Sequence, residues 1–197
     1  KDIGRTKLGN HIKINPHFAR ADLRVTISGV KVHPLAGYGG GGKAILPGIA
    51  WSESIDYFHR TIGGVGENKN ETTGPAKIYK NECRKDMDEA GRLARVDFSV
   101  QTIYNGSRQV VDVFAGDIVD AYRTACHKAN KHFRTKVARN ADVVVVNGFP
   151  QNAQPFNGMH WARRCLRDGG SVVLVTQYSP GIESLHYMRD RWNYEPS

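Results

Sequence analysis

The sequence predicts an α/β protein, because segments with the periodicity of strands alternate with segments that have the periodicity of helices. Residues 23–28 alternate apolar and polar side chains, as a half-buried strand does. Residues 142–147 and 171–176 are instead short continuous apolar runs, which are typical of parallel strands buried on both faces. Because a helical stretch joins these two runs, we expect a βαβ unit whose strands pair in parallel.

The first predicted helix covers residues 50–62, where apolar side chains recur at three- and four-residue spacing. Phe58 and Ile62 belong to this apolar face. His59 shares the face, so we expect its imidazole to point inward. A Gly-Gly pair follows at once and should end the helix.

A second helix is predicted to begin at an Asn81 cap and to run to about residue 95. Residues 96–104 and 109–114 alternate on either side of Asn105-Gly106, which is the pattern of a β-hairpin. A third helix follows this hairpin. We place a domain boundary near residues 136–141, where the pattern changes to that of the βαβ unit.

Charge and composition restrict the classes of function. The 197 residues carry a formal net charge of +9, but the basic residues are spread through the predicted helices and are not interleaved with aromatic ones. We therefore expect no nucleic-acid partner, and an anionic substrate or cofactor phosphate for a few of the basic residues. No apolar run reaches the roughly 18 residues of a membrane span, so no membrane partner is expected. The three cysteines stand far apart, which fits a reducing, cytoplasmic setting.

The most informative motif is a histidine, a glycine-rich run and a lysine, followed by a second histidine. His33 and Lys43 are ten residues apart, and His59 follows the lysine by sixteen. The run between them contains Gly39, Gly40, Gly41 and Gly42, whose missing β-carbons would let the backbone approach a ligand closely. A lysine can hold a phosphate or bond covalently to a carbonyl-type group. Histidines shuttle protons near neutral pH or bind transition metals.

Other interpretations of this motif remain open. The Gly-x-x-x-x-Gly-Lys spacing matches a P-loop, but Ala44 stands where a hydroxyl would hold magnesium. Pro47-Gly48 would also stop a long helix from starting directly after the lysine. The glycines could form a merely flexible loop, and each histidine alone could be a structural residue. A non-catalytic module that binds a nucleotide or another anion through the P-loop-like glycine loop is the alternative function.

The motif and several other segments resemble the nickel-dependent lactate racemase family. The resemblance is carried by His-Pro-Leu-Ala-Gly-Tyr-Gly-Gly-Gly-Gly-Lys-Ala-Ile-Leu-Pro-Gly-Ile-Ala at residues 33–50 and by residues 58–60, 85–94, 113–117 and 143–150. It extends over nearly the whole sequence, from about residue 12 to residue 180.

The resemblance implies a specific cofactor, a pyridinium mononucleotide with two sulfur arms that grip nickel (pyridinium-3,5-bisthiocarboxylic acid mononucleotide nickel). Lys43 would tether this nickel-pincer nucleotide through a thioamide, the loop glycines would contact it, and His59 would ligate the nickel. His33 would be one of two proton-transfer bases, a role that suits a side chain with a pKa near neutrality. The implied reaction is racemisation or epimerisation of a small 2-hydroxy acid by hydride transfer through a 2-keto acid.

The resemblance also implies an organisation in two α/β domains with the active site in the cleft between them. Residues 1–138 would be the remainder of an N-terminal cofactor-binding domain, and residues 139–197 the start of a C-terminal domain. The second base and the phosphate-binding residues would lie outside this sequence, which we interpret as a fragment. Separate maturation enzymes would load the cofactor.

One departure from the family concerns the substrate. Where the family has a glutamine and, three residues later, a lysine, our best register places Asn157 and His160. The loss of a permanent cation predicts a larger or more polar 2-hydroxy acid than lactate. We therefore expect lactate to be a poor substrate.

Overall fold

The computed structural model describes residues 1–64, 70–149 and 158–176. The chain divides into two compact units, residues 1–134 and residues 135–197. Strands and helices occur in both units, so the predicted α/β class is confirmed. None of the described helices is long and apolar enough to cross a bilayer.

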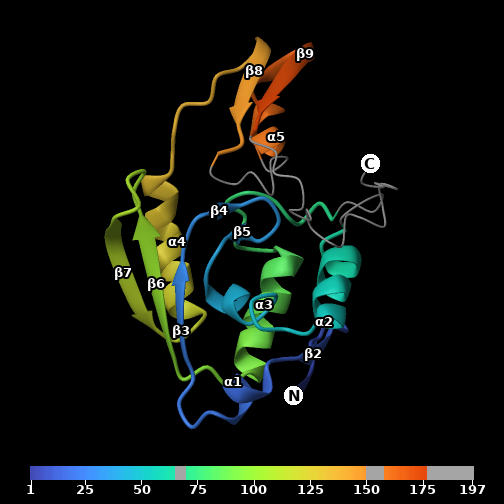
Figure 1. The fold of residues 1–197 in the computed structure, drawn as a ribbon, viewed down its shortest axis with the longest axis vertical. Helices are drawn as coiled ribbons and strands as arrows, with labels where there is room; N and C mark the ends of the chain where they lie inside the picture. The colour runs from blue at the N-terminus through green and yellow to red at the C-terminus, as the bar shows by residue number, and fades with distance from the viewer. Residues whose placement is uncertain (65–69, 150–157, 177–197) are drawn as a thin grey trace. The chain divides into compact units, whose positions relative to one another are not determined.

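The largest sheet of the first unit has the strand order β3-β6-β7. β3 (Val25–Gly29) runs parallel to β6 (Phe98–Tyr104), and β6 runs antiparallel to β7 (Val110–Gly116). The loop at 105–109 is therefore the predicted hairpin turn, in which the Asn105 side-chain oxygen accepts hydrogen bonds from the N–H groups of Ser107 and Gln109. Helix α4 (Asp120–His132) packs against β6 and β7, as Figure 1 shows.

The two faces of this sheet differ in their surroundings. Side chains on the face toward α4 are buried, including Gln101 and Ile103 of β6. The opposite face is apolar and exposed, with Ile27 74% and Val113 58% accessible. The alternation that predicted these strands thus places polar groups such as Gln101 inside, because the glycine loop supplies their hydrogen-bond partners.

Helix α3 (Glu82–Leu93) is the central helix of the larger core cluster. Its Asn81 cap is confirmed, since the Asn81 side chain accepts a hydrogen bond from the Arg84 N–H at 3.1 Å. Met87 and Ala90 are fully buried in this cluster, together with Phe58, which directly follows helix α2 (Ser52–Tyr57). The N-terminal strands β1 (Asp2–Arg5) and β2 (His11–Lys13) and helix α1 (Pro16–Arg20) complete this part of the unit.

The helix predicted over residues 50–62 is present with two differences. It begins at Ser52, and after Tyr57 it widens into the π-helix η2 (Phe58–Ile62). Phe58 and Ile62 are buried as predicted, and the helix ends at Gly63, whose N–H donates to the Phe58 carbonyl at 2.8 Å. Single π-turns of this kind occur often at functional sites.

The glycine-rich run forms two short elements. β4 (Val32–His33) and β5 (Gly37–Tyr38) pair as a small antiparallel hairpin, with His33 opposite Gly37. The 3-10 helix η1 (Gly41–Ala44) follows and contains Lys43. No long helix begins after the lysine, as Pro47-Gly48 predicted, and the Leu46–Pro47 peptide bond is cis.

The second unit corrects one expectation. β8 (Ala141–Asn147) and β9 (Leu166–Val175) pair in parallel as predicted, and α5 (Met159–Ala162) packs on both strands. The prediction that both faces of these strands are buried was wrong for the described residues, since Val145 is 66% and Val173 46% accessible. Among the described elements only the four residues of α5 cover this pair, so alternate valines face solvent.

Candidate functional site

The hairpin β4–β5 holds His33 by its imidazole. The Nδ1 atom accepts hydrogen bonds from the N–H groups of Leu35 at 3.2 Å and Ala36 at 3.1 Å. Because Nδ1 is an acceptor, the neutral ring carries its proton on Nε2. Burial, with the positive charges of Lys43, Arg84, His59 and Lys31, lowers the pKa of His33 to about 3. The expectation of a pKa near neutrality is therefore not met in this state of the protein.

Lys43 is half-buried on η1, next to the glycines. No ion pair or hydrogen bond of its amine is found among the described residues. Burial, reinforced by the charges of Arg84 and Lys31, lowers the pKa of Lys43 to about 8. An amine with this pKa is neutral, and hence nucleophilic, in a larger fraction of molecules at pH 7 than an ordinary lysine.

The loop glycines contact the protein itself. Gly39, Gly40, Gly41 and Gly42 are all buried. A β-carbon on Gly42 would overlap the Met87 carbonyl group of α3, and one on Gly41 would lie 2.7 Å from the Tyr122 ring of α4. The observed reason for glycine at these positions is therefore close packing of the loop between α3 and α4. Contact of these glycines with a cofactor stays a prediction.

His59 lies in η2, half-buried beside the Phe58 ring. Its Nδ1 atom is 2.9 Å from the Ile55 carbonyl oxygen. A carbonyl oxygen only accepts, so Nδ1 carries the proton and the lone pair of the neutral ring is on Nε2. This is the arrangement in which a histidine ligates a metal through Nε2 while a backbone carbonyl orients the ring.

The three residues of the predicted motif lie in one neighbourhood. The charges of Lys43 and His59 both act on the His33 ring, although the three belong to η1, η2 and β4. Arg84 of α3 acts on His33 and Lys43 alike and was missed by the sequence analysis, which counted it among basic residues spread through helices. The available signal was its spacing, because Arg84, Met87, Asp88 and Gly91 recur three or four residues apart and so share one face of the helix.

The side chains of the two predicted substrate residues, Asn157 and His160, lie outside the part of the chain that the structure describes. Asn157 lies outside the described residues. His160 belongs to α5, but its side chain also lies outside what the structure describes. Their role in substrate selection stays a prediction, as does the cleft between domains.

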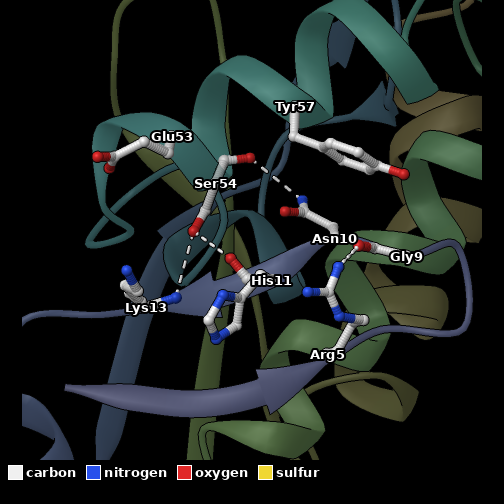
Figure 2. A pocket seen from close by; sticks show the side chains of 8 residues that line it. All are labelled: Arg5, Gly9, Asn10, His11, Lys13, Glu53, Ser54 and Tyr57. Carbon is white, nitrogen blue, oxygen red and sulfur yellow. Dashed lines mark hydrogen bonds between the residues drawn. The ribbon is translucent and has the colours of Figure 1, made fainter.

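A separate pocket of about 180 Å³ opens between β2 and α2, and Figure 2 shows its lining. The polar groups there bond to one another: the Arg5 guanidinium donates to the Gly9 carbonyl at 2.6 Å, and the Ser54 hydroxyl to the His11 carbonyl at 2.6 Å. None of the residues of the histidine–lysine–histidine motif lines this pocket. Within the described residues, no three His, Cys, Asp or Glu side chains cluster tightly enough to hold a metal ion by themselves.

Fold and site together define an α/β domain in which a half-buried lysine with a lowered pKa and two imidazoles of opposite tautomer lie in one electrostatic environment. His33 offers an N–H donor at Nε2, and His59 a lone pair at Nε2. Such a set can form a covalent amide and supply one ligand to a metal whose other ligands come from a bound molecule.

Comparisons with known proteins show which proteins this chain is similar to. Residues 1–73 match the lactate racemase N-terminal domain. The lactate racemase of Lactiplantibacillus plantarum is 30% identical over 178 residues, which are 88% of this chain and 41% of the relative. The lactate racemase of Thermoanaerobacterium thermosaccharolyticum is 30% identical over 184 residues, which are 91% of this chain and 42% of the relative.

Two solved structures resemble the fold. The lactate racemase apoprotein from Thermoanaerobacterium thermosaccharolyticum has a TM-score of 0.75 and 27% identity, over 87% of this chain and 41% of that one. A crystal structure of a protein from Thermotoga maritima has a TM-score of 0.62 and 19% identity, over 87% of this chain and 45% of that one, and shows a shared fold alone. The chain is similar to lactate racemases over nearly its whole length and spans about two fifths of the length of the curated relatives it matches.

Proposed function

We propose that this chain is part of a racemase or epimerase of a 2-hydroxy acid that works with a nickel-pincer nucleotide. The relationship to lactate racemases over nearly the whole chain is the observation that carries the proposal. When bound, this cofactor would accept a hydride from the 2-carbon of the substrate and return it. The residues of the chain would hold the cofactor, orient the substrate and control the proton on its hydroxyl group.

Lys43 fits the role of a covalent tether. Its lowered pKa leaves a usable fraction of neutral amine for condensation with a thiocarboxyl group of the cofactor, in which the new C–N bond would replace a C–O bond and water would leave. Lys31 and Arg84 add positive potential around it, which suits the phosphate of a mononucleotide.

His59 fits the role of a nickel ligand. His59 would supply an imidazole nitrogen to the nickel of the cofactor, a ligand type that suits this metal. The Ile55 carbonyl already selects the tautomer with its lone pair on Nε2. One histidine suffices for such a site, so the lack of a protein-only metal cluster among the described residues is compatible with this role.

His33 would act at the substrate hydroxyl group. In the structure described here its low pKa disfavours uptake of a proton, and the Lys43 charge is the second cause of that shift after burial. A thioamide at Lys43 carries no charge, so attachment of the cofactor would remove one of the cations that hold the His33 pKa down. We therefore expect the His33 pKa to rise in the loaded protein. To accept the hydroxyl proton at Nε2, the ring would first move its own proton from Nε2 to Nδ1 and give up the hydrogen bonds from the Leu35 and Ala36 N–H groups.

The proposal is tested by producing the protein together with the cofactor maturation enzymes of a lactate racemase system. The tryptic peptide that contains Lys43 should then show the mass increase of the cofactor, and a Lys43→Ala variant should not. His59→Ala should lower the nickel content while the circular dichroism spectrum stays unchanged. An unmodified Lys43 peptide in protein that demonstrably interconverts hydroxy-acid enantiomers would refute the tether.

The same protein tests the substrate class. Single-enantiomer lactate and larger 2-hydroxy acids are incubated separately and analysed by chiral chromatography. The replacement of a permanent cation by His160 leads us to expect faster interconversion of a larger acid. Cofactor attachment at Lys43 without interconversion of any acid would favour the alternative, a non-catalytic nucleotide-binding module. A cytoplasmic location follows from the same proposal, because loading requires intracellular maturation enzymes.

A further inference from the structure

Among the residues that the structure describes, Arg84 is the largest fully buried side chain. It projects from the first turn of α3, three residues after the Asn81 cap. A buried arginine is rare unless its charge and its five N–H donors are all engaged. The groups that bond to Arg84 therefore indicate its structural role.

The guanidinium group bonds to three carbonyl groups of the glycine-rich run. It donates to the carbonyl oxygens of Tyr38 at 2.6 Å, Gly40 at 3.2 Å and Ala36 at 3.4 Å. These residues alternate along the chain, so their carbonyls point to the same side, toward α3. The Tyr122 ring of α4 lies 4.0 Å from the guanidinium carbon, as in a cation–π pair.

Two of these three carbonyl-bearing residues are bonded directly to residues of the predicted site. Ala36, whose carbonyl accepts from Arg84, donates its N–H to His33 Nδ1 at 3.1 Å. Gly40, whose carbonyl also accepts from Arg84, receives the backbone N–H of Lys43 at 3.2 Å. The guanidinium is thus linked by hydrogen bonds to the His33 ring through the backbone of Ala36, and to the Lys43 backbone through the carbonyl group of Gly40.

We propose that Arg84 is a positioning residue that sets the His33 imidazole and the Lys43 backbone in one arrangement by holding the carbonyl groups of residues 36–40. This inference rests on the proposed function for its catalytic meaning, since Arg84 itself touches neither of the reacting groups. The planar fork of arginine matches several carbonyl acceptors at once, which a lysine ammonium cannot reproduce.

Asp88 is the charge partner of Arg84. Its carboxylate lies 3.6 Å from the guanidinium and 3.8 Å from the Arg123 side chain. Because Asp88 is nearly buried, removal of the Arg84 charge would leave a poorly compensated carboxylate. An Arg84→Lys variant keeps a positive charge beside Asp88 and so remains a useful test if Arg84→Met does not fold.

The experiment uses full-length protein without cofactor, nickel or substrate. Arg84→Met, Arg84→Lys and the control Arg92→Met, which removes an exposed arginine from the same helix, are compared with the wild type. Circular dichroism establishes that each variant is folded. Hydrogen exchange then measures the protection of residues 35–43, and acetic anhydride labelling as a function of pH gives the titration midpoint of the Lys43 amine by peptide mass spectrometry.

Both Arg84 variants should exchange hydrogen faster at residues 35–43, because the lysine restores the charge but not the fork. In Arg84→Met the labelling midpoint should also rise by about one pH unit, which makes labelling near pH 7 about tenfold slower. Arg92→Met should match the wild type in both measurements. Unchanged protection of residues 35–43 in folded Arg84→Lys would overturn the proposal and leave Arg84 as a source of charge alone.

These readouts separate the inference from the proposed function. Loss of protection in the Arg84 variants supports a positioning role even if Lys43 is later found to carry no cofactor. Conversely, a cofactor on Lys43 together with unchanged protection in both Arg84 variants would uphold the proposed function and refute the role of Arg84.

Discussion

The glycine loop and the β8–β9 pair illustrate how differently similar compositions can be used. Both are runs of small or apolar residues. The loop residues 39–42 are all buried, with Gly41 packed against α4 and Gly42 against α3, and a buried arginine donates to the Gly40 carbonyl group. In the strand pair, by contrast, Val145 is 66% accessible. The comparison teaches that burial is decided by the elements that pack against a segment and not by its own hydrophobicity.

The largest expected effect tests the packing of the loop. Gly42→Ala would place a methyl group on the Met87 carbonyl of α3, and backbone atoms there cannot move aside easily. We expect a loss of at least about 3 kcal/mol in the free energy of unfolding. Gly106→Ala in the hairpin turn is the control, because nothing lies within 4 Å of its added methyl group. Urea unfolding measures both, and similar stabilities of the two variants would contradict the packing argument.

A second pair of variants compares the loss of stability on truncating a side chain of α3 beneath the glycine loop with that on truncating a side chain of β8. Met87→Ala removes a fully buried side chain and should cost about 2–4 kcal/mol, because it leaves a cavity under the loop. Val145→Ala removes an exposed side chain and should cost less than about 1 kcal/mol. Hydrogen exchange at α3 and at β8 follows each unit separately. A larger loss at Val145 than at Met87 would mean that β8 is covered.

The acid dependence of stability tests the surroundings of His33. The unfolded chain binds a proton at this residue near pH 6.5, whereas the folded ring stays neutral down to about pH 3. Below pH 6.5 protonation of His33 therefore favours the unfolded chain. The free energy of unfolding should fall by about 1.4 kcal/mol per pH unit as the pH drops from 6.5 toward 3, and His33 should have no such effect above pH 6.5.

The raised pKa values of Asp86 and Asp88 act in the opposite sense, so the wild type must be compared with a variant. His33→Asn keeps an acceptor for the Leu35 and Ala36 N–H groups but does not titrate. Its stability should fall less steeply between pH 6 and pH 4 in urea titrations. Parallel curves for the two proteins would show that His33 is solvated normally.

The smallest expected effect concerns Lys43, whose charged amine destabilises the folded protein because it is largely removed from water. Its pKa of about 8 means that the unfolded chain binds the proton more tightly, so stability should rise between pH 8 and pH 10.5. Lys43→Met should therefore stabilise the cofactor-free protein by about 1–2 kcal/mol at pH 7, as is common at functional residues. Lys85→Met on the exposed side of α3 should change it by less than about 0.5 kcal/mol. A destabilised Lys43→Met protein would argue against a desolvated amine.

The sequence by itself determined the features that depend on a few neighbouring residues. The Asn81 cap, the Asn105-Gly106 hairpin and the end of the helix at Gly63 were all predicted and are all present. Each rests on local backbone chemistry, such as a side-chain oxygen that accepts from an N–H three residues later. The histidine–lysine–histidine motif was found in the same way, from residue types and spacing in a continuous segment.

Only the tertiary structure decided the environment of those residues. Arg84 reads as one more helical basic residue, yet it bonds to Ala36 across 48 positions of the chain. The pKa values of His33 and Lys43 depend chiefly on burial, which no local pattern encodes. The exposure of the β8 valines depends likewise on which elements cover the strand pair. Desolvation and long-range contact are properties of the packed chain, because they arise from residues that are remote in sequence and adjacent only after folding.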